Sequence, residues 1–221
     1  MQTQTTNRTP ICHYPHNRAA HAIFGAVELV GVPLSFAKEA EIYGENEPAE
    51  YVYKVLTGAV RITRVLQDGR RQIEAFYFPG DVFGLEFGAE HTSSAEAVSS
   101  ATIALVKRST LLAAATRDSS LSNQLLTHTA RELEQARRHA MLLVKTAQER
   151  VASFLIEISK QLVGGSVELP MSRQDIADYL GLTIETVSRT LTQLQKTCTI
   201  EFATSRRMIL RNKQALISLN S

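Results

Sequence analysis

The sequence of 221 residues lacks most of the features that assign a chain to a special class of protein. It has two cysteines, Cys12 and Cys198, and no tryptophan. No apolar run approaches the ~20 residues that a membrane-spanning helix needs. Two cysteines so far apart do not supply the clustered ligands of an iron–sulfur or zinc site. We therefore expect two unpaired thiols in a reducing compartment, and no contact with a membrane.

The charge of the chain is almost balanced, with a formal net charge of +2 at pH 7. The excess lies after Gly164, where seven Lys or Arg face five Asp or Glu. Such a small excess is compatible with a DNA-binding domain but does not establish one. The hydrophobic content of 44% is ordinary for a soluble globular protein. Residues 1–20 contain no apolar stretch typical of a secretory signal, so we expect a cytoplasmic protein.

From about Val27 to Val106 the sequence is typical of short strands separated by turns. Residues 59–65 alternate apolar and charged side chains, which predicts a half-buried strand. Asp68-Gly69 favours the hairpin turn that follows, and residues 72–78 supply the partner strand. The segments 51–56 and 101–106 are also rich in β-formers. Many strands at this spacing predict an antiparallel barrel or roll.

After Ser109 the pattern becomes helical. Apolar and small side chains recur at steps of three and four along one long helix, and Glu132, Glu134, Gln135, Arg137 and Arg138 lie between them. This seam can pack onto its own β-domain or pair with the same helix of a second subunit, and the residues alone leave both open. Its members are Leu126, Thr129, Leu133, Ala136, Ala140 and Leu143. A second helix is expected from about Thr146 to Leu162. Gly164 and Gly165 follow it and mark a domain boundary.

Residues 172–196 carry the strongest functional pattern. Ser172 and Asp175 have the spacing of a capping box, and Gly181 is placed to end the helix in a left-handed turn. Thr183 can then cap a second helix. A small residue at Ala177, glycine at Gly181 and a branched residue at Val187 have the spacing of a helix-turn-helix. We therefore predict a DNA-binding motif here.

The second helix of this motif has two distinct faces. Val187, Leu191 and Leu194 form the stripe expected to be buried. The opposite face carries Ile184, Glu185, Ser188, Arg189 and Thr192. Arg, Glu and Ser are suited to read base edges in the major groove. Downstream, residues 199–202 and 208–210 predict a β-hairpin wing with Arg206 and Arg207 at its tip, near DNA phosphates.

Residues 172–191 (SRQDIADYLGLTIETVSRTL) closely resemble the DNA-binding signature of the CRP/FNR regulators, in particular the FNR and FixK branch. Residues 53–60 (YKVLTGAV) and 78–84 (FPGDVFG) are similar to the β-roll of that family. The resemblance implies an α+β fold with an N-terminal antiparallel β-roll, a long dimerisation helix and a C-terminal winged helix-turn-helix. The expected divisions are a flexible leader at 1–22, the β-roll at 23–116, the dimerisation helix at 117–145 and the DNA-binding domain at 146–221.

The same resemblance implies a homodimer that binds double-stranded DNA at a TTGA–TCAA palindrome and acts with RNA polymerase. By position, Glu185, Ser188 and Arg189 are the base-contacting residues. The residues expected at the DNA backbone are Ser172, Arg173, Thr183, Thr186, Arg206 and Arg207. The function expected is that of an activator in microaerobic and nitrogen-fixation gene control. Nothing in the sequence favours an enzyme: it has no phosphate loop, metal-ligand spacing or nucleophile beside a base.

The effector positions depart from the cyclic-nucleotide binders of the family. Those proteins have Glu directly after the glycine that Gly84 matches, and an Arg-Ser pair near Ser93 and Ser94. Here Leu85 and Ser93 replace the Glu and the Arg, and Glu86 is displaced by one position. A cyclic phosphate would therefore lack its charged partner. We expect no cofactor and a FixK-like regulator that binds DNA without an effector.

An alternative is a sensor gated by haem or by another ligand. His13, His16, His21 and His91 are candidate axial ligands, although solvated histidines are the simpler interpretation. An FNR-type cluster is not expected, because Cys12 stands alone near the N-terminus. Cys198 follows the reading helix, and its oxidation could disturb DNA docking, which defines a redox-switch hypothesis.

Overall fold

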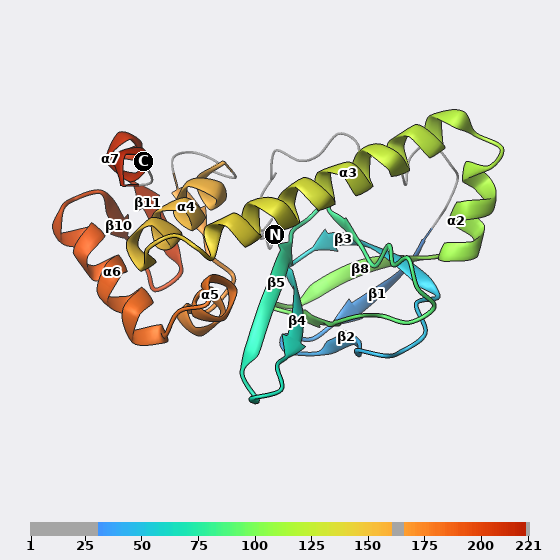
Figure 1. Ribbon diagram of the computed structural model, residues 1–221, viewed down its shortest axis with the longest axis horizontal. Coiled ribbons are helices and arrows are strands. Elements are labelled where there is room, and N and C mark those ends of the chain that lie inside the picture. The colour runs from blue at the N-terminus through green and yellow to red at the C-terminus, as the bar shows by residue number, and fades with distance from the viewer. Residues whose placement is uncertain (1–30, 161–165, 220–221) are drawn as a thin grey trace, which may run out of the picture.

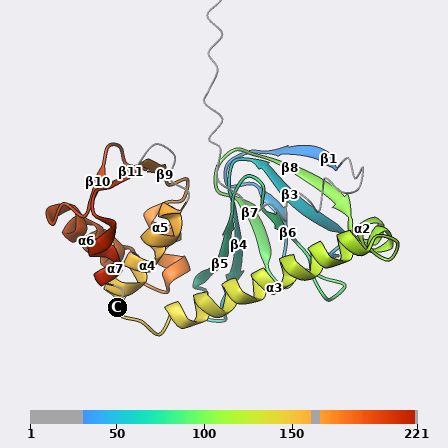
Figure 2. The ribbon, with the colours of Figure 1, turned by 90° about the horizontal axis from the view of Figure 1, so that it is seen from above.

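The computed structural model describes residues 31–160 and 166–219. The predicted leader 1–22, with Cys12, His13, His16 and His21, lies outside these residues, and so does the boundary at Gly164-Gly165. The described chain forms two lobes that are joined by one long helix, α3 (Ser119–Leu142) (Figure 1). A view turned by 90° shows α3 running along one side of the β-domain and ending at the C-terminal lobe (Figure 2).

The N-terminal lobe is a β-roll of two four-stranded sheets, as the sequence predicted. One sheet has the order β1-β8-β3-β6 and the other β2-β7-β4-β5, and the pairs in both are antiparallel. The strands are β1 (Val32–Phe36), β2 (Glu41–Tyr43), β3 (Tyr51–Thr57), β4 (Val60–Val65), β5 (Arg71–Tyr77), β6 (Val82–Phe83), β7 (Ser94–Ala97) and β8 (Ala101–Lys107). The predicted strand segments correspond to β3, β4, β5 and β8, whereas β1, β2, β6 and β7 were not predicted individually. A strand of two residues such as β6 is too short to show an alternating pattern.

Two helices connect the roll to the C-terminal lobe. A short α2 (Arg108–Ala115), which the sequence analysis did not predict, follows β8 directly. The N-cap of α3 is Asp118, whose side chain accepts hydrogen bonds from the backbone N–H groups of Ser120 and Leu121. α3 buries Leu121 and His128 against the roll. The predicted long helix is therefore present, and one of its faces packs on its own chain.

The C-terminal lobe contains four helices and a small sheet among the described residues. The helices are α4 (Ala147–Ser159), α5 (Arg173–Leu180), α6 (Ile184–Lys196) and α7 (Lys213–Ser218). The strands are β9 (Ser166–Glu168), β10 (Ile200–Phe202) and β11 (Arg207–Leu210), and their order in the sheet is β10-β11-β9. The predicted wing hairpin is thus part of a three-stranded sheet, because β9 pairs with β11.

One apolar core crosses the boundary between the lobes. Ile73, Phe76 and Phe78 of the roll belong to the same buried cluster as Ile176 and Leu180 of the C-terminal lobe. A second core lies between the two sheets of the roll, and a third lies under α2 and the start of α3. The two lobes therefore share apolar contacts as well as the chain connection.

The alternating pattern of residues 59–65 was wrong about Arg61. The sequence places this arginine on the solvent side of a half-buried strand, but its exposed fraction is 4%. Thr63, on the same face of β4, is also buried. The physical reason is that the C-terminal lobe and the neighbouring strand β7 cover this face and provide carboxylates for the guanidinium.

No helix among the described residues is both long enough and apolar enough to cross a membrane.

Candidate DNA-binding surface

α5 begins at the capping box that the sequence predicted. The Ser172 hydroxyl accepts a hydrogen bond from the Asp175 N–H at 3.0 Å, and the Asp175 carboxylate accepts one from the Ser172 N–H at 2.8 Å. The helix ends at Gly181, whose φ of 61° and ψ of 40° lie in the left-handed region. A side chain is disfavoured in that conformation, which explains the need for glycine in the turn.

α6 follows after the three residues 181–183, with Thr183 as its N-cap. Its Val187, Leu191 and Leu194 are buried with exposed fractions of 2% or less. This stripe packs with Ala177 and Leu180 of α5 in the shared apolar core. The packing fixes the rotation of α6 about its own axis, so the opposite face must point away from the lobe.

The three predicted base-reading residues lie on that outward face. Glu185 and Arg189 are exposed, and Ser188 is half-buried. The Arg173 guanidinium approaches the Ser188 hydroxyl at 3.4 Å, which brings a basic side chain of α5 to the middle of α6. Together they give α6 a polar face with one carboxylate, one hydroxyl and cationic groups beside it.

Most of the residues predicted to contact the DNA backbone are exposed. Ser172, Arg173, Thr183 and Arg206 are exposed, and the Thr183 and Thr186 hydroxyls lie 3.1 Å apart at the start of α6. Arg207 differs from the prediction, because it is the first residue of β11 and not part of the wing tip. Its Nε and Nη2 both donate to the Ser166 hydroxyl at 3.2 Å.

Arg150 is a residue of this region that sequence reasoning missed. From α4 its Nη1 donates to the backbone carbonyls of Leu180 and Gly181, at 2.9 and 3.3 Å, and its Nε donates to that of Lys145. The last carbonyls of α5 lack partners inside the helix, so this arginine satisfies them and braces the turn. No local pattern could reveal the contact, because 30 residues separate the partners.

The predicted seam on α3 faces away from the roll along most of its length. Leu126 and Leu133 have exposed fractions of 70% and 51%, and Thr129, Ala136 and Ala140 are also exposed. The reading in which this stripe packs onto its own β-domain is therefore wrong. Leu143 departs from the stripe, since it is half-buried beside Gly181.

Glu132 was expected on the faces of α3 between the seam residues, and in the structure it turns towards the roll. Its carboxylate accepts a hydrogen bond from the Tyr77 hydroxyl at 2.7 Å. Burial raises the pKa of Glu132, and it raises the pKa of Tyr77 well above the ordinary value. Tyr77 belongs to β5, so this contact ties the long helix to the sheet.

The effector positions of the roll are filled by its own side chains. Gly84 has a φ of 79°, and a Cβ there would lie 2.6 Å from the Tyr53 ring. Ser93, in the position of the family's phosphate-binding Arg, is buried. Its hydroxyl donates to Glu74 at 2.9 Å and accepts from Arg64 at 3.1 Å. A carboxylate and a guanidinium of the same chain therefore meet at this position, and both side chains are about two-fifths exposed.

His91 is buried, so the expectation of a solvated side chain was wrong for this histidine. Its exposed fraction is 1%, and its ring stacks on Tyr43 with centroids 3.6 Å apart. Nδ1 lies 3.5 Å from a Glu86 oxygen without hydrogen-bond geometry, and Nε2 has no hydrogen-bond partner in the described part of the chain. Burial lowers the pKa of His91, which favours the neutral ring.

Cys198 is an exposed free thiol directly after α6, with a φ of 53°. Within residues 31–160 and 166–219, no group of three or more His, Cys, Asp or Glu side chains is placed to hold a metal ion.

Comparisons with known proteins agree with this arrangement. Residues 33–118 match the cyclic nucleotide-binding domain, and residues 149–219 match the Crp-like helix-turn-helix domain. The nitrogen fixation regulation protein FixK of Azorhizobium caulinodans is 50% identical over 202 residues, which cover 88% of this chain and 82% of that protein. FixK of Rhizobium meliloti is 41% identical, with 81% of this chain and 82% of that protein covered.

A solved structure of FixK2 from Bradyrhizobium japonicum superposes with a TM-score of 0.85. It is 53% identical, and the match covers 87% of this chain and 98% of that one. The two FixK relatives are named as regulation proteins, and the fold, the helix-turn-helix and the identity over most of the chain agree. The chain belongs to the CRP/FNR family of transcription regulators and resembles its FixK members.

Proposed function

We propose that this regulator binds a TTGA–TCAA palindrome as a homodimer, without an effector. The observation that carries the proposal is the outward face of α6, where Glu185, Ser188 and Arg189 lie opposite a fully buried apolar stripe. A helix held in this way can enter the major groove with its polar face towards the base edges.

The side chains of this face fit the edges of the proposed half-site. Arg189 can donate two hydrogen bonds to guanine O6 and N7, and Glu185 can accept from the N4 amino group of cytosine. Ser188 can act as donor or acceptor, or contact a thymine methyl group. TTGA and its complement contain one G·C pair, which gives Glu185 and Arg189 partners on opposite strands of the same base pair.

Backbone contacts would hold α6 in register. The residues proposed for these contacts carry hydroxyl or guanidinium groups that can bond to phosphate oxygens. They are Ser172, Arg173, Thr183, Thr186 and Arg206. Arg207 is a weaker candidate than the sequence suggested, because two of its nitrogens are engaged with Ser166. It still adds positive charge to the wing.

The second copy of this chain is the proposed occupant of the exposed face of α3. Leu126 and Leu133 alternate there with small side chains, as in the seam of two paired helices. Pairing along α3 would place two helix-turn-helix motifs on the same side of the dimer, as a two-fold palindrome requires.

Independence from a cyclic nucleotide is supported by the residues at the effector positions. Leu85 cannot accept a hydrogen bond from a ribose hydroxyl. Ser93 cannot neutralise a phosphate, and its hydroxyl is bonded to Glu74 and Arg64. A phosphate entering there would also meet the Glu74 carboxylate, which repels it.

The relatives supply the biological context of the proposal. Those from Azorhizobium caulinodans and Rhizobium meliloti are named for the regulation of nitrogen fixation. We infer a cytoplasmic activator of nitrogen-fixation and microaerobic genes, which acts through RNA polymerase.

Selection of the preferred site from random DNA, with purified protein and no added effector, tests these points together. The expected result is a TTGA–TCAA palindrome, bound by two copies of the chain with a strong dependence on salt. Single half-sites without two-fold symmetry would contradict the dimer. Binding that required a small molecule would contradict independence from an effector.

Ligand gating is the second candidate function, and buried His91 favours it. A neutral imidazole whose Nε2 has no hydrogen-bond partner among the described residues can ligate haem iron or bond to a small molecule in the roll. The purified protein would then carry a haem absorbance band, or melt at a higher temperature with its ligand. His91→Phe would abolish either effect, and an unchanged band or shift would show that the ligand binds elsewhere.

A further inference from the structure

The contact between the β-roll and the helix-turn-helix is more than a consequence of chain connection. α3 ends at Leu142 and α4 begins at Ala147, so a link of residues 143–146 joins the lobes. This link limits the distance between the two lobes but does not set their relative orientation. The orientation of α5 and α6 therefore depends on the side chains that bridge the lobes directly.

The apolar half of the bridge centres on Tyr179 of α5. Its ring lies 5.3 Å from that of Phe76 on β5, 4.3 Å from that of His139 on α3 and 5.9 Å from that of Phe154 on α4, measured between centroids. The Gln72 side chain also donates to the Tyr179 carbonyl at 3.4 Å. One residue of α5 thus contacts the roll, the long helix and its own lobe.

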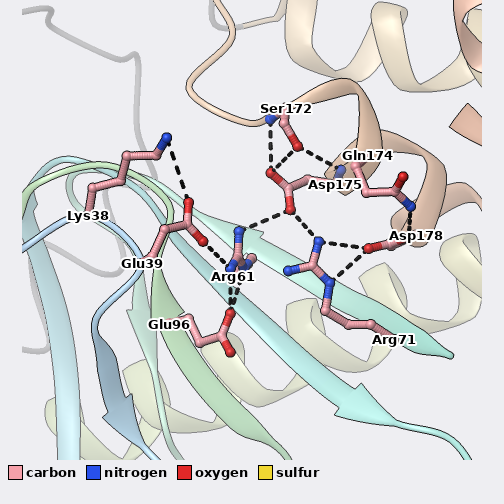
Figure 3. A network of polar contacts seen from close by, with 9 residues as sticks. All are labelled: Lys38, Glu39, Arg61, Arg71, Glu96, Ser172, Gln174, Asp175 and Asp178. Atoms are coloured by element: carbon pink, nitrogen blue, oxygen red, sulfur yellow. Dashed lines mark hydrogen bonds and ion pairs between the residues drawn. The ribbon is translucent and has the colours of Figure 1, made fainter. Parts of the chain in front are cut away.

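The polar half of the bridge begins at the buried Arg61. Its guanidinium donates to Glu39 at 2.5 Å, to Glu96 at 2.7 Å and to Asp175 at 3.0 Å (Figure 3). Glu39 and Glu96 belong to the roll, whereas Asp175 belongs to α5. A buried guanidinium with three carboxylates is well compensated, and removal of one partner would leave charge unpaired.

Asp175 joins this network to the capping box of α5. Its Oδ1 accepts from Arg61 and from Arg71, the latter at 2.7 Å, while its Oδ2 accepts from the N–H and hydroxyl of Ser172. Burial alone would raise the pKa of Asp175, but these hydrogen bonds and the two guanidinium groups together lower it. The carboxylate is therefore charged at neutral pH and available to both arginines.

Arg71 makes a second attachment one turn further along α5. Its Nε donates to Asp178 at 2.7 Å, so two successive carboxylates of the helix are held by one arginine of β5 (Figure 3). Two points of attachment define the direction of a helix, whereas a single point leaves it free to pivot.

The network ends next to the surface proposed to bind DNA. Asp175 is bonded to Ser172, and the neighbouring Arg173 reaches Ser188 on α6. A change in the orientation of α5 would therefore move the whole reading face relative to α3.

We propose that Arg61 and Arg71 of the β-roll are positioning residues for DNA binding, which set the angle between the helix-turn-helix and α3. In the dimer this angle determines the separation of the two reading helices, and hence the half-site spacing that the protein accepts. The inference rests on the proposed homodimer and its palindrome. Neither arginine needs to touch DNA for this role.

Arg71→Gln is the test variant, because Arg71 is partly exposed and its loss leaves Arg61 with its three carboxylates. Arg70→Gln is the matched control, since Arg70 is the adjacent arginine of the same hairpin and its side chain bonds to Asp68. Affinity is measured for the selected palindrome and for versions with one base pair added to or removed from the spacer. Arg71→Lys keeps the charge and should restore part of the selectivity.

We expect Arg71→Gln to lose about five- to tenfold in affinity for the preferred spacing, in the lower range of coupling between two sites. The loss should be smaller for the altered spacers, so that spacing selectivity falls while Arg70→Gln keeps it. Equal losses at all spacings would show that Arg71 contributes only charge or stability, and would overturn the proposal. Wild-type selectivity in Arg71→Gln would do the same.

Hydrogen exchange of the free protein provides a readout that does not involve DNA. Arg71→Gln should speed amide exchange in α5 and along β5, with no change in the core between the two sheets of the roll. Unchanged exchange in α5 would overturn the proposal even if the protein binds no palindrome. Failure of the wild type to bind the palindrome, with faster exchange in the variant, would instead contradict the proposed function.

Discussion

The β-roll and the helix-turn-helix use their polar side chains in opposite ways. The roll buries Arg61, Thr63, His91 and Ser93 and pairs most of their polar atoms within the chain. The polar residues on the outward face of α6 stay exposed or half-buried, because the apolar stripe beneath them supplies the packing. The polar groups of the roll thus bond mainly within the protein, whereas those on the outward face of α6 are accessible to a partner.

This difference teaches where specificity can be altered with little effect on the fold. A side chain on the outward face of α6 can be removed without leaving a buried group unpaired. Its removal should therefore change the affinity for DNA more than the stability of the fold. Removal of a polar side chain inside the roll leaves its buried hydrogen-bond partners unpaired, which destabilises the fold. Asp175 of the C-terminal lobe resembles the polar residues of the roll, since it is buried and bonded to residues of both regions.

The largest effect is expected from the apolar stripe that supports the reading face. Leu191→Ala should destabilise the protein by about 2–5 kcal/mol, because the side chain is fully buried and its loss leaves a cavity. Denaturant unfolding followed by circular dichroism measures the change. Leu112→Ala on α2 is the matched control, since that leucine is 47% exposed and should cost far less. Equal losses would mean that α6 is not packed as described.

Removal of a reading side chain should affect DNA binding while sparing the fold. Arg189→Ala should lose about 1–3 kcal/mol of binding free energy at its base pair and relax specificity there. Titration of the palindrome and of single-base variants measures both. Arg117→Ala is the control for the loss of one positive charge, because Arg117 is exposed near the start of α3. If Arg189→Ala weakened binding to random DNA equally, Arg189 would be a phosphate contact only.

The helix-turn-helix could be predicted from sequence because its determinants are local. The capping box, the left-handed glycine and the buried stripe all lie within residues 172–194, and the structure has each of them where the pattern indicated. Their geometry follows from hydrogen bonds and packing between close neighbours in the chain.

The interior of the roll and its bridge to α5 could not be predicted in the same way. Arg61 and Asp175 are 114 residues apart, and Arg71 and Asp178 are 107 apart. An alternating pattern predicts that an arginine in a strand faces solvent. Only the tertiary fold shows that carboxylates from other elements cover Arg61. His91, Glu132 and Arg150 were misjudged or missed for the same reason, since their partners come from distant elements.

A smaller effect is expected from Asp81, which shows the cost of a buried charge in the roll. Burial raises its pKa to about 6, so between about pH 4 and 6 the folded state holds a proton that the unfolded state has lost. Its contribution to stability is therefore greatest at low pH and is lost as pH rises through 6. Asp81→Asn should gain on the order of 1 kcal/mol at pH 8 relative to wild type, and less at pH 5.

Denaturant unfolding at the two pH values measures this difference. Asn can keep the hydrogen bond from the Phe78 N–H, which Asp81 accepts at 2.8 Å. Asp68→Asn is the control, because the hydrogen bonds from Arg70 lower the pKa of that exposed carboxylate. It should show no gain at pH 8. A loss of stability in Asp81→Asn at both pH values would indicate that the charge itself is needed.

The smallest effect is expected at the filled effector position of the roll. Glu74 and Arg64 are each about two-fifths exposed, so Glu74→Gln should cost about 0.2–1 kcal/mol, as for other exposed ion pairs. Glu157→Gln removes a matched exposed pair in the C-terminal lobe and should cost as little. Because the pair does not belong to the bridge at Asp175, DNA affinity should be unchanged in both variants. A loss of affinity in Glu74→Gln alone, reversed by an added anionic ligand, would mean that the roll is an effector-gated domain in which the Glu74 carboxylate takes the place of a bound anion.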